Sequence, residues 1–377
     1  MAFFLTVLAV WGSMHLYVFL RVWAYTGVPA RYAAMAAPVW VLLMFSPMLG
    51  LMLERSGHPA AARVLGVPGM IWAGAFFLLF SVSLLHDFYN GVLTVASFAV
   101  PALGRARLMG PRPVLAEAGL VALITLYSMV EARMVGIEHV VIPTSKLPPG
   151  HQRIRIAQIT DVHLGLAVGR SRLERIAGLI ESAQPDIIVS TGDLVDSTLH
   201  GSESTASVLA QMQAPLGKFA VTGNHEYYAG LPQALEFTRQ AGFQMLMNQT
   251  QRITEGLTIA GFDDPTAAGM GQAPPWDEKK ILQGADQGDF VLVLKHRPPR
   301  EPDALPLRDL QLSGHTHRGQ IFPFSIIIRL YYEYPAGLVQ TAPGHYLYTS
   351  RGTGTWGPPM RFLNPPEVTV VDLVPAQ

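Results

Sequence analysis

Residues 153–163 read RIRIAQITDVH, and this stretch joins a buried strand to two polar side chains. Arg153–Thr160 alternates between polar and apolar residues and then becomes apolar, which is typical of a strand that enters the core of a domain. Asp161 and His163 follow directly after it. In layered α/β sheets, the carboxyl ends of the strands meet at one edge and carry ligand-binding side chains. The stretch therefore predicts an α/β domain with functional groups at the end of its first strand.

The same arrangement occurs four more times along the chain. A short apolar run, predicted to be a strand, is followed each time by an acid, an amide or an imidazole. These pairs are Asp186–Ser190 with Gly192-Asp193, Lys218–Val221 with Gly223-Asn224-His225-Glu226, Phe290–Leu294 with Lys295-His296, and Leu310–Leu312 with Gly314-His315-Thr316-His317. Glycine lets the backbone turn sharply at three of these ends. Further strands are predicted at Leu257–Ala260, Tyr346–Thr349 and Val368–Leu373, and helices at Arg170–Ala183, Ser204–Met212 and Leu231–Ala241. Strands that alternate with helices indicate a mixed, layered α/β domain.

The five strand ends supply side chains that hard and borderline divalent metals accept as ligands. Together they hold two aspartates, one asparagine and five of the chain's twelve histidines. This set exceeds what one tetrahedral ion needs and suits two ions that share a carboxylate. Two ions about 3.5–4 Å apart can hold a phosphoryl group and lower the pKa of a water between them. The pattern therefore favours phosphoester hydrolysis by a metal-bridging hydroxide, without a covalent protein nucleophile.

In order, the five blocks read DVH, GD, GNHE, H and GHTH, and over roughly residues 150–375 they resemble the calcineurin-like metallophosphoesterase superfamily. The order of parts is also similar to a subgroup of YkuE-type enzymes and transmembrane proteins with a metallophosphoesterase domain. This second similarity rests on the apolar N-terminal part, on Arg318-Gly319-Gln320-Ile321 and on Gly352-Thr353-Gly354. The resemblance implies a four-layer α/β/β/α sandwich and a metal-dependent phosphoric ester hydrolase.

The resemblance also implies a role for each polar residue of the blocks. The first metal ion would be bound by Asp161, His163 and His317, the second by Asn224, His296 and His315, and Asp193 would bridge both. His225 would act as a general acid or hydrogen-bond donor at the leaving-group oxygen, which places it with Asp193 and Asn224 among the expected catalytic residues. Glu226 or another nearby carboxylate would orient an imidazole. Arg318 would either meet the substrate phosphate or be a solvent-facing or structural residue. The two divalent ions would be Mn, Fe or Zn.

Residues 1–147 differ in composition from the rest of the chain. They hold nine Arg or Lys and five Asp or Glu, whereas the remaining 230 residues hold 40 of the 54 charged side chains. Four apolar stretches reach or approach the roughly 20 residues that a membrane-spanning helix needs; they are Ala2–Leu20, Ala33–Leu53, Val64–Leu85 and Val114–Val130. Phe88–Leu103 is either a fifth span or an interfacial segment. We therefore expect a transmembrane helical region at residues 1–137, a proline-marked linker at 138–150 and the metallophosphoesterase domain at 151–377.

Arginines in the short loops predict the side of the membrane on which the domain lies. Five arginines lie on the side opposite to the C-terminal domain and three lie on its own side; they are Arg21, Arg31, Arg105, Arg107 and Arg112 against Arg55, Arg63 and Arg133. Positive charge favours the cytoplasmic side. We therefore expect an integral protein of a bacterial plasma (inner) membrane with an extracytoplasmic catalytic domain. His15, Asp87 and Glu117 lie in or near the spans, where we expect interfacial or interhelical hydrogen bonds.

The expected substrate is a phosphorylated small molecule or a lipid. A membrane anchor favours phospholipids or lipid-linked diphosphates in the bilayer, and the resemblance points to substrates such as that of a UDP-2,3-diacylglucosamine hydrolase. The apolar segment Ile321–Tyr334 follows the last block and would form either a lip that dips into lipid or a core strand with a packed loop. The alternatives are hydrolysis of soluble nucleotides or phosphoproteins, and a non-catalytic metal-binding sensor on the same fold.

The composition argues against other classes of function. The formal net charge is zero and the chain has no long basic run, which disfavours nucleic-acid binding. It has no cysteine, so disulfides and thiolate metal ligands are excluded. Few ionisable groups in only four or five spans disfavour a transporter.

Overall fold

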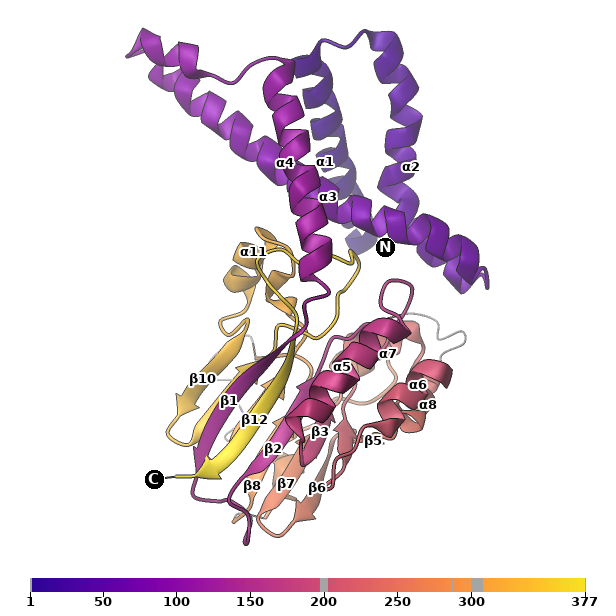
Figure 1. The fold of residues 1–377 in the computed structure, drawn as a ribbon, viewed down its shortest axis with the longest axis vertical. Helices are drawn as coiled ribbons and strands as arrows, with labels where there is room; N and C mark the ends of the chain where they lie inside the picture. Colours follow the sequence, from indigo (N-terminus) through magenta and orange to yellow (C-terminus); the bar gives the residue numbers. More distant parts are fainter. Residues whose placement is uncertain (1, 197–202, 287, 300–307, 377) are drawn as a thin grey trace. The chain divides into compact units, whose positions relative to one another are not determined.

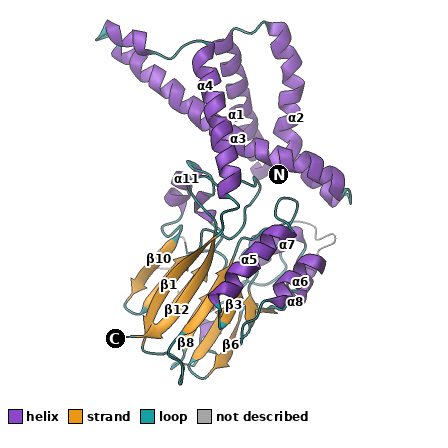
Figure 2. Ribbon diagram, viewed as in Figure 1, coloured by secondary structure: helices purple, strands orange, loops and turns teal. Residues whose placement is uncertain are grey.

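The fold is described from a computed structural model, in which residues 2–196, 203–286, 288–299 and 308–376 are placed. The chain divides into two compact units between Met129 and Val130. The first unit is helical, and the second contains two β-sheets and further helices. Figure 1 gives the order of the elements along the chain, and Figure 2 distinguishes helices, strands and loops.

The helices of the first unit are apolar along most of their length. They are α1 (Ala2–Thr26), α2 (Ala30–Arg55), α3 (Pro59–Ala96), the 3₁₀ helix η1 (Pro101–Ala106) and α4 (Pro111–Glu131). Each of α1 to α4 is long and apolar enough to cross a membrane, in agreement with the four predicted spans. Residues 88–96 continue α3 and residues 101–106 form η1, so the described residues contain no fifth span.

Polar groups inside the helical unit are bonded to one another. The Arg21 guanidinium on α1 donates to Glu117 on α4 over 2.8 and 3.0 Å and to Asp87 on α3 over 2.8 Å. The His15 Nε2 atom accepts a hydrogen bond of 3.4 Å from Trp72 on α3. An unpaired charge in an apolar environment is costly, which is why such groups pair across helices. The expected interhelical hydrogen bonds are thereby confirmed.

The second unit contains two six-stranded sheets. Their strand orders are β1-β12-β2-β3-β4-β5 and β10-β11-β9-β8-β7-β6. The strands are β1 (Gly136–Thr144), β2 (Ile154–Ile159), β3 (Ile187–Ser190), β4 (Lys218–Ala220), β5 (Gln244–Met245), β6 (Gln249–Thr254), β7 (Leu257–Gly261), β8 (Phe290–Leu294), β9 (Leu310–Ser313), β10 (Gly337–Ala342), β11 (His345–Thr349) and β12 (Glu367–Pro375). Strands β2 to β5 run parallel to one another, as do β7, β8, β9 and β11. Parallel pairing places their carboxyl ends along one edge of each sheet.

Apolar side chains fill three interfaces, one between the two sheets and one between each sheet and its helices. Successive residues of a strand point to opposite faces of its sheet. Ile156 of β2 and Leu292 of β8 accordingly lie in the core between the two sheets. Ala157 packs with the helices α5, α6 and α8 that cover the first sheet in Figure 2, while Val293 packs with Leu282 of α10 on the outer face of the second. The predicted α/β/β/α order of layers is confirmed.

The remaining helices connect these strands. They are α5 (Arg170–Ala183), α6 (Glu203–Gln211), α7 (Asn224–Ala229), α8 (Leu231–Gln240), α9 (Thr266–Gly269), α10 (Glu278–Leu282), the 3₁₀ helix η3 (His317–Gly319) and α11 (Phe324–Tyr331). The predicted helix Arg170–Ala183 and the predicted strand Phe290–Leu294 have the observed bounds. The shorter α7, α9 and α10 were not predicted.

Two stretches differ from the expectation. Residues 138–144 of the expected linker belong to β1, which pairs in parallel with β12 over nine residues. Val140 and Ile142 enter the core between the sheets, and this burial outweighs the prolines that suggested a linker. The interpretation of Ile321–Tyr334 as a core strand is wrong, because Phe324–Tyr331 forms the helix α11, which has no buried side chain.

Candidate metal centre

The polar ends of five strands meet in one region, as the sequence predicted. Their loops are joined by backbone hydrogen bonds: Asp161 N donates to the carbonyl oxygen of Gly192 over 3.0 Å, and Gly314 N donates to that of His296 over 2.8 Å. Three groups of side chains hold their ligand atoms within 4.8 Å of one another; the groups are Asp161, His163 and His317, then His163, Asp193 and His225, then Asp193, His296 and His315. Two residues, His163 and Asp193, each belong to two groups.

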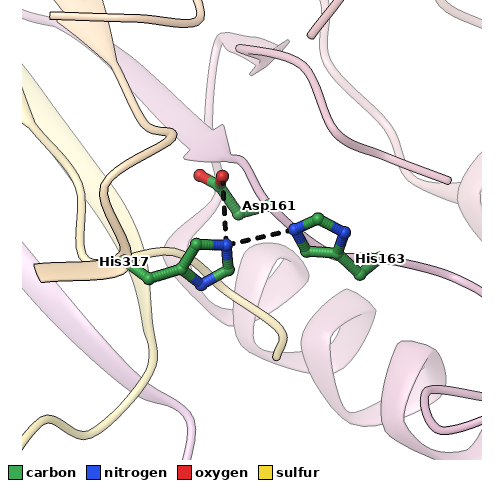
Figure 3. Close-up of side chains that lie close together, drawn as sticks. All are labelled: Asp161, His163 and His317. Atoms are coloured by element: carbon green, nitrogen blue, oxygen red, sulfur yellow. Dashed lines mark hydrogen bonds and ion pairs between the residues drawn. The ribbon is translucent and has the colours of Figure 1, made fainter. Parts of the chain in front are cut away.

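The first group contains the three residues expected to bind one ion (Figure 3). The Nε2 atom of His317 lies 3.4 Å from Asp161 Oδ1 and 3.1 Å from His163 Nε2. The three residues come from the loops after β2 and β9 and are almost completely buried. Two imidazole nitrogens and a carboxylate oxygen turned toward one point form a donor set that suits Mn, Fe or Zn.

Asp193 connects the first group to the last. Its Oδ2 atom lies 3.8 Å from His163 Nε2 and 3.2 Å from His296 Nε2. His296 Nε2 in turn lies 3.1 Å from His315 Nδ1. One carboxylate therefore stands between two sets of imidazoles, which is the position that a ligand shared by two ions would occupy.

Asn224 supplies an independent indication that a cation belongs here. Its side-chain Oδ1 atom is buried and accepts no hydrogen bond from any group that the structure describes. Both of its neighbours contact Asp193: His225 N donates to Asp193 Oδ1 over 2.8 Å, and a side chain on Gly223 would overlap that carboxylate. An unsatisfied buried amide oxygen costs about 1–3 kcal/mol unless a ligand compensates it. The residues present therefore fit divalent metal ions, while their individual roles as ligands stay a prediction.

His225 stands at the edge of this centre and is held by a residue that the sequence analysis missed. Its Nδ1 atom lies 2.9 Å from Asp196 Oδ1, which also lies 3.1 Å from His163 Nδ1. Asp196 thus forms a hydrogen bond with one predicted ligand, His163, and an ion pair with the predicted acid, His225. It follows Asp193 by three residues in the loop after β3, and that spacing was the only signal in the sequence.

Glu226 has a different role from the one expected. Its carboxylate accepts hydrogen bonds from the backbone N–H groups of Gly223, Asp193 and Leu194, over 2.6, 2.9 and 2.8 Å. Glu226 therefore joins the loops after β3 and β4, and its hydrogen bonds go to backbone rather than to an imidazole. Asp196 is the carboxylate that orients imidazoles in this site.

Arg361 is a second residue that the sequence analysis missed. It is fully buried and lies with its guanidinium 3.2 Å from His317 Nδ1. The same group donates to the carbonyl oxygens of Gly352 and Gly354, and Gly354 N donates to Asp161 O over 3.0 Å. The segment Gly352-Thr353-Gly354 therefore supports the loop that carries Asp161.

The backbone of the site is strained, and its glycines are required. Five predicted ligands have left-handed backbone with φ between 47° and 70°; they are Asp161, His163, Asp193, His315 and His317. Such conformations persist only where the surrounding structure enforces them, and they concentrate at functional sites. A side chain at Gly314 would overlap Asp161 and Thr160, and one at Gly192 would lie 2.5 Å from Gly223 N. The glycines of the motifs thus permit the close approach of the loops.

Burial and mutual charge shift the pKa values of these groups in opposite directions. Burial lowers the pKa of His296, but the Asp193 carboxylate outweighs it and raises the pKa to about 10. Burial, with the neighbouring His296, lowers the pKa of His315 to about 3, and burial lowers the pKa of His317 well below its ordinary value. Neutral imidazole is the form that binds metal ions.

Comparisons with known proteins agree with this geometry. The family model described as calcineurin-like phosphoesterase matches residues 154–319. An uncharacterized metallophosphoesterase of Aquifex aeolicus (strain VF5) is 42% identical over 255 residues, which are 67% of this chain and 97% of that protein. The transmembrane protein with metallophosphoesterase domain of Danio rerio is 34% identical over 67% of this chain and 61% of its own length. The uncharacterized metallophosphoesterase YkuE of Bacillus subtilis (strain 168) is 33% identical over 64% of this chain and 87% of its own length.

Proposed function

Because the chain belongs to the calcineurin-like metallophosphoesterase family, we propose that it is a membrane-anchored phosphoesterase with two divalent metal ions, Mn, Fe or Zn. Its family makes it a phosphoric ester hydrolase. Its four apolar helices, together with relatives named transmembrane proteins, make it a membrane protein. The observation that carries the proposal is the place of Asp193, whose Oδ2 lies within 3.8 Å of His163 and 3.2 Å of His296.

The proposed ligands divide into two sets around that carboxylate. Asp161, His163 and His317 would hold one ion, Asn224, His296 and His315 the other, and Asp193 both. When bound, the ions supply positive charge for the phosphoryl oxygens and an activated water for attack on phosphorus. The chain's own contribution is to fix the positions of these donors, through the loop hydrogen bonds and the bonds that Glu226 accepts.

His225 is the residue that we assign to the leaving group. Asp196 lies beside its Nδ1 atom, which leaves Nε2 as the ring atom that can face substrate. A protonated imidazole there would donate its Nε2 proton to the departing oxygen while the Asp196 carboxylate stays 2.9 Å from Nδ1 as its ion-pair partner. Burial lowers the pKa of His225, but Asp193 and Asp196 outweigh it and raise the pKa to about 9.

The surface beside His225 supports a substrate with an apolar part. Tyr228 and Trp356 have ring centres 5.4 and 6.1 Å from that of His225, and both side chains are about half exposed. We propose a lipid or lipid-linked substrate whose phosphoester or pyrophosphate bond enters the centre while its apolar part lies along these rings. A UDP-2,3-diacylglucosamine-type diphosphate is one candidate if the domain faces the cytoplasm of a bacterium. The extracytoplasmic orientation that the arginines favour would instead present phospholipids of the outer leaflet of the inner membrane.

Replacement of the shared carboxylate tests the proposal. Asp193→Asn keeps the volume of the side chain but removes its charge, so both ions should be bound weakly and phosphate release should be lost. Elemental analysis of the full chain in detergent gives the metal content, and hydrolysis of bis-p-nitrophenyl phosphate with added Mn gives the activity. Asp286→Asn, at a side chain 58% exposed in a turn, is the matched control and should change neither. Full activity of Asp193→Asn would refute the assignment.

A substrate panel separates the remaining alternatives. Phosphatidyl esters, the UDP-lipid, soluble nucleotides and a phosphoprotein would be compared under the same conditions. A preference for the soluble substrates would replace the lipid proposal with the first alternative. A wild-type chain that binds two ions yet hydrolyses nothing would favour the non-catalytic sensor. Labelling of single cysteines from each side of the membrane would give the orientation, since the natural chain has no cysteine.

A further inference from the structure

Helix α11 carries its apolar side chains on the surface. Ile326, Ile327, Leu330 and Tyr331 are 51–84% exposed, and their positions form one arc around the helix. A helix of a soluble domain normally buries such an arc in the core and leaves its polar face in water. The nearby Phe322 and Leu363 are also exposed, at 42% and 61%. These six residues, defined as the α11 patch, form an exposed apolar surface among the residues that the structure describes.

Two arginines that make no ion pair with any described acid lie on and beside this helix, Arg329 in α11 and Arg318 in η3. Arg318 and Arg329 both line a cavity of about 440 Å³ and a second one of about 200 Å³, and the second is also lined by Phe322, Ile326 and Leu363 of the α11 patch. Among the residues that the structure describes, no acid lies within ion-pair distance of either guanidinium. The acids of the larger cavity, Glu138 and Glu367, are both paired with Arg351. Positive charge therefore remains uncompensated beside the apolar patch.

The last residue of helix α4 contacts the residues beside this surface. Helix α4, one of the four apolar helices, ends at Glu131, which belongs to the second unit. The Glu131 carboxylate accepts hydrogen bonds from the backbone N–H groups of Leu363 and Asn364, over 3.1 and 2.6 Å. Both of these residues line the smaller cavity. The last residue of an apolar helix of membrane-spanning length thus lies next to the α11 patch.

We propose that the α11 patch, with Arg318 and Arg329, is a binding site for an anionic phospholipid of the bilayer. The apolar arc lies among acyl chains while the two guanidinium groups bind the headgroup phosphate. The seven proposed metal ligands line neither cavity, so this site is separate from the metal centre. An apolar arc beside cationic side chains fits an anionic lipid better than a soluble anion. A soluble anion would not contact the exposed leucine and isoleucines. The site also changes the role expected for Arg318, from substrate phosphate to membrane phosphate.

The absence of cysteine allows a direct test on the full chain. Leu330→Cys would carry an environment-sensitive fluorophore, and Glu255→Cys, in the turn between β6 and β7 at the amino end of β7, would serve as the matched control. Each labelled protein, held in a neutral detergent, would be titrated with spin-labelled phosphatidylglycerol or spin-labelled phosphatidylcholine. Each arginine near an anionic surface strengthens binding about fivefold, so two predict half-quenching by phosphatidylglycerol at a roughly 30-fold lower concentration. The fluorophore at position 255 should not distinguish the two lipids.

Charge variants show whether the arginines are responsible. Arg318→Gln together with Arg329→Gln should reduce the 30-fold preference nearly to one, whereas Arg153→Gln with Arg252→Gln removes the same charge elsewhere and should preserve it. An equal response to both lipids, or a preference unchanged in the first double variant, would overturn the proposal. Displacement of phosphatidylglycerol by an excess of inorganic phosphate would assign the pair to soluble anions and would also overturn it. The assay measures no turnover, so its outcome is independent of the proposed hydrolysis.

Discussion

Replacement of Asp196 by asparagine should slow the release of poor leaving groups more than the release of good ones. The Asp196 Oδ1 atom lies 2.9 Å from His225 Nδ1 and 3.1 Å from His163 Nδ1, so one carboxylate orients the proposed acid and a proposed ligand. Asparagine has the same shape but carries an N–H₂ group in place of one oxygen. Both rings contact the same oxygen, so asparagine with its oxygen at that position would lose only the negative charge. With its N–H₂ group at that position, each ring would have to accept at Nδ1 and carry its proton on Nε2. His163 would then lose the lone pair that binds metal, or His225 would lose its cationic form.

The size of the effect follows from these two contacts. Loss of a carboxylate that orients a metal-binding imidazole costs about 10–100-fold in activity. Loss of a positioned acid costs about 10²–10⁴-fold for a leaving group that must be protonated. For alkyl phosphate esters both losses apply, and their product predicts that kcat falls by about 10³- to 10⁶-fold. For p-nitrophenyl esters, whose leaving group needs no proton, only the first part applies and the loss should be about 10–100-fold.

The assay compares kcat for both classes of ester in wild type and Asp196→Asn, together with metal content by elemental analysis and thermal unfolding. Asp286→Asn again controls for the removal of one acidic group from a loop. An equal loss for both classes of leaving group, with metal content unchanged, would show that Asp196 does not act through the acid. Unchanged activity would refute the role of Asp196 altogether.

Three further predictions concern the site and the domain that supports it. Gly314→Ala should abolish turnover, because its methyl group would overlap Asp161, whereas Gly178→Ala, which meets no atom within 4 Å inside α5, should preserve activity and stabilise the domain by about 0.5–1 kcal/mol. Chelation should lower the thermal unfolding temperature and Mn should restore it, since a ligand at 1,000 times its Kd stabilises by about 4 kcal/mol; an unchanged temperature would exclude bound metal. Hydrogen bonds from Arg155 lower the pKa of Asp372, so this pair stabilises the fold above the ordinary carboxyl pKa and loses its effect as the pH falls through the lowered one. Asp372→Asn should therefore cost about 1–2 kcal/mol at pH 7, and denaturant titration should show that this difference shrinks below about pH 4.

The strands and the groups at their ends were predictable because two strong patterns coincide in the sequence. Apolar runs such as Phe290–Leu294 are buried on both faces of a sheet, so their composition alone identifies them. A polar residue such as His296 is conspicuous when it directly follows such a run. The convergence of these ends is then a consequence of parallel pairing, which brings carboxyl ends together whatever the details of the loops.

Other features depend on contacts that leave no local pattern. Asp196 is one of many aspartates in loops, and only its distance from two imidazoles distinguishes it. Arg361 is buried through carbonyl oxygens that come from a loop, and nothing in the sequence marks an arginine as buried. Helix α11 was ambiguous because apolar runs of this length fit strands and helices equally, and its exposure contradicts the ordinary rule that apolar residues are buried. Strand β1 was hidden by the prolines around it.

The left-handed backbone of five proposed ligands explains why the site needs so large a support. Each such residue costs about 1 kcal/mol or more relative to ordinary backbone. The strain is maintained by bonds that the loops make with one another, such as His163 N to Asp193 O at 3.0 Å and the four backbone N–H groups that bond to Glu226. Those loops are anchored in turn by the parallel strands of two mixed sheets that pack face to face. The strained backbone lowers local stability but holds the donors in fixed positions. Fixed donors are what stabilisation of a transition state by charge requires. Removal of the Glu226 carboxylate should therefore disorder the donors of both proposed ions at once, although Glu226 is itself no proposed ligand.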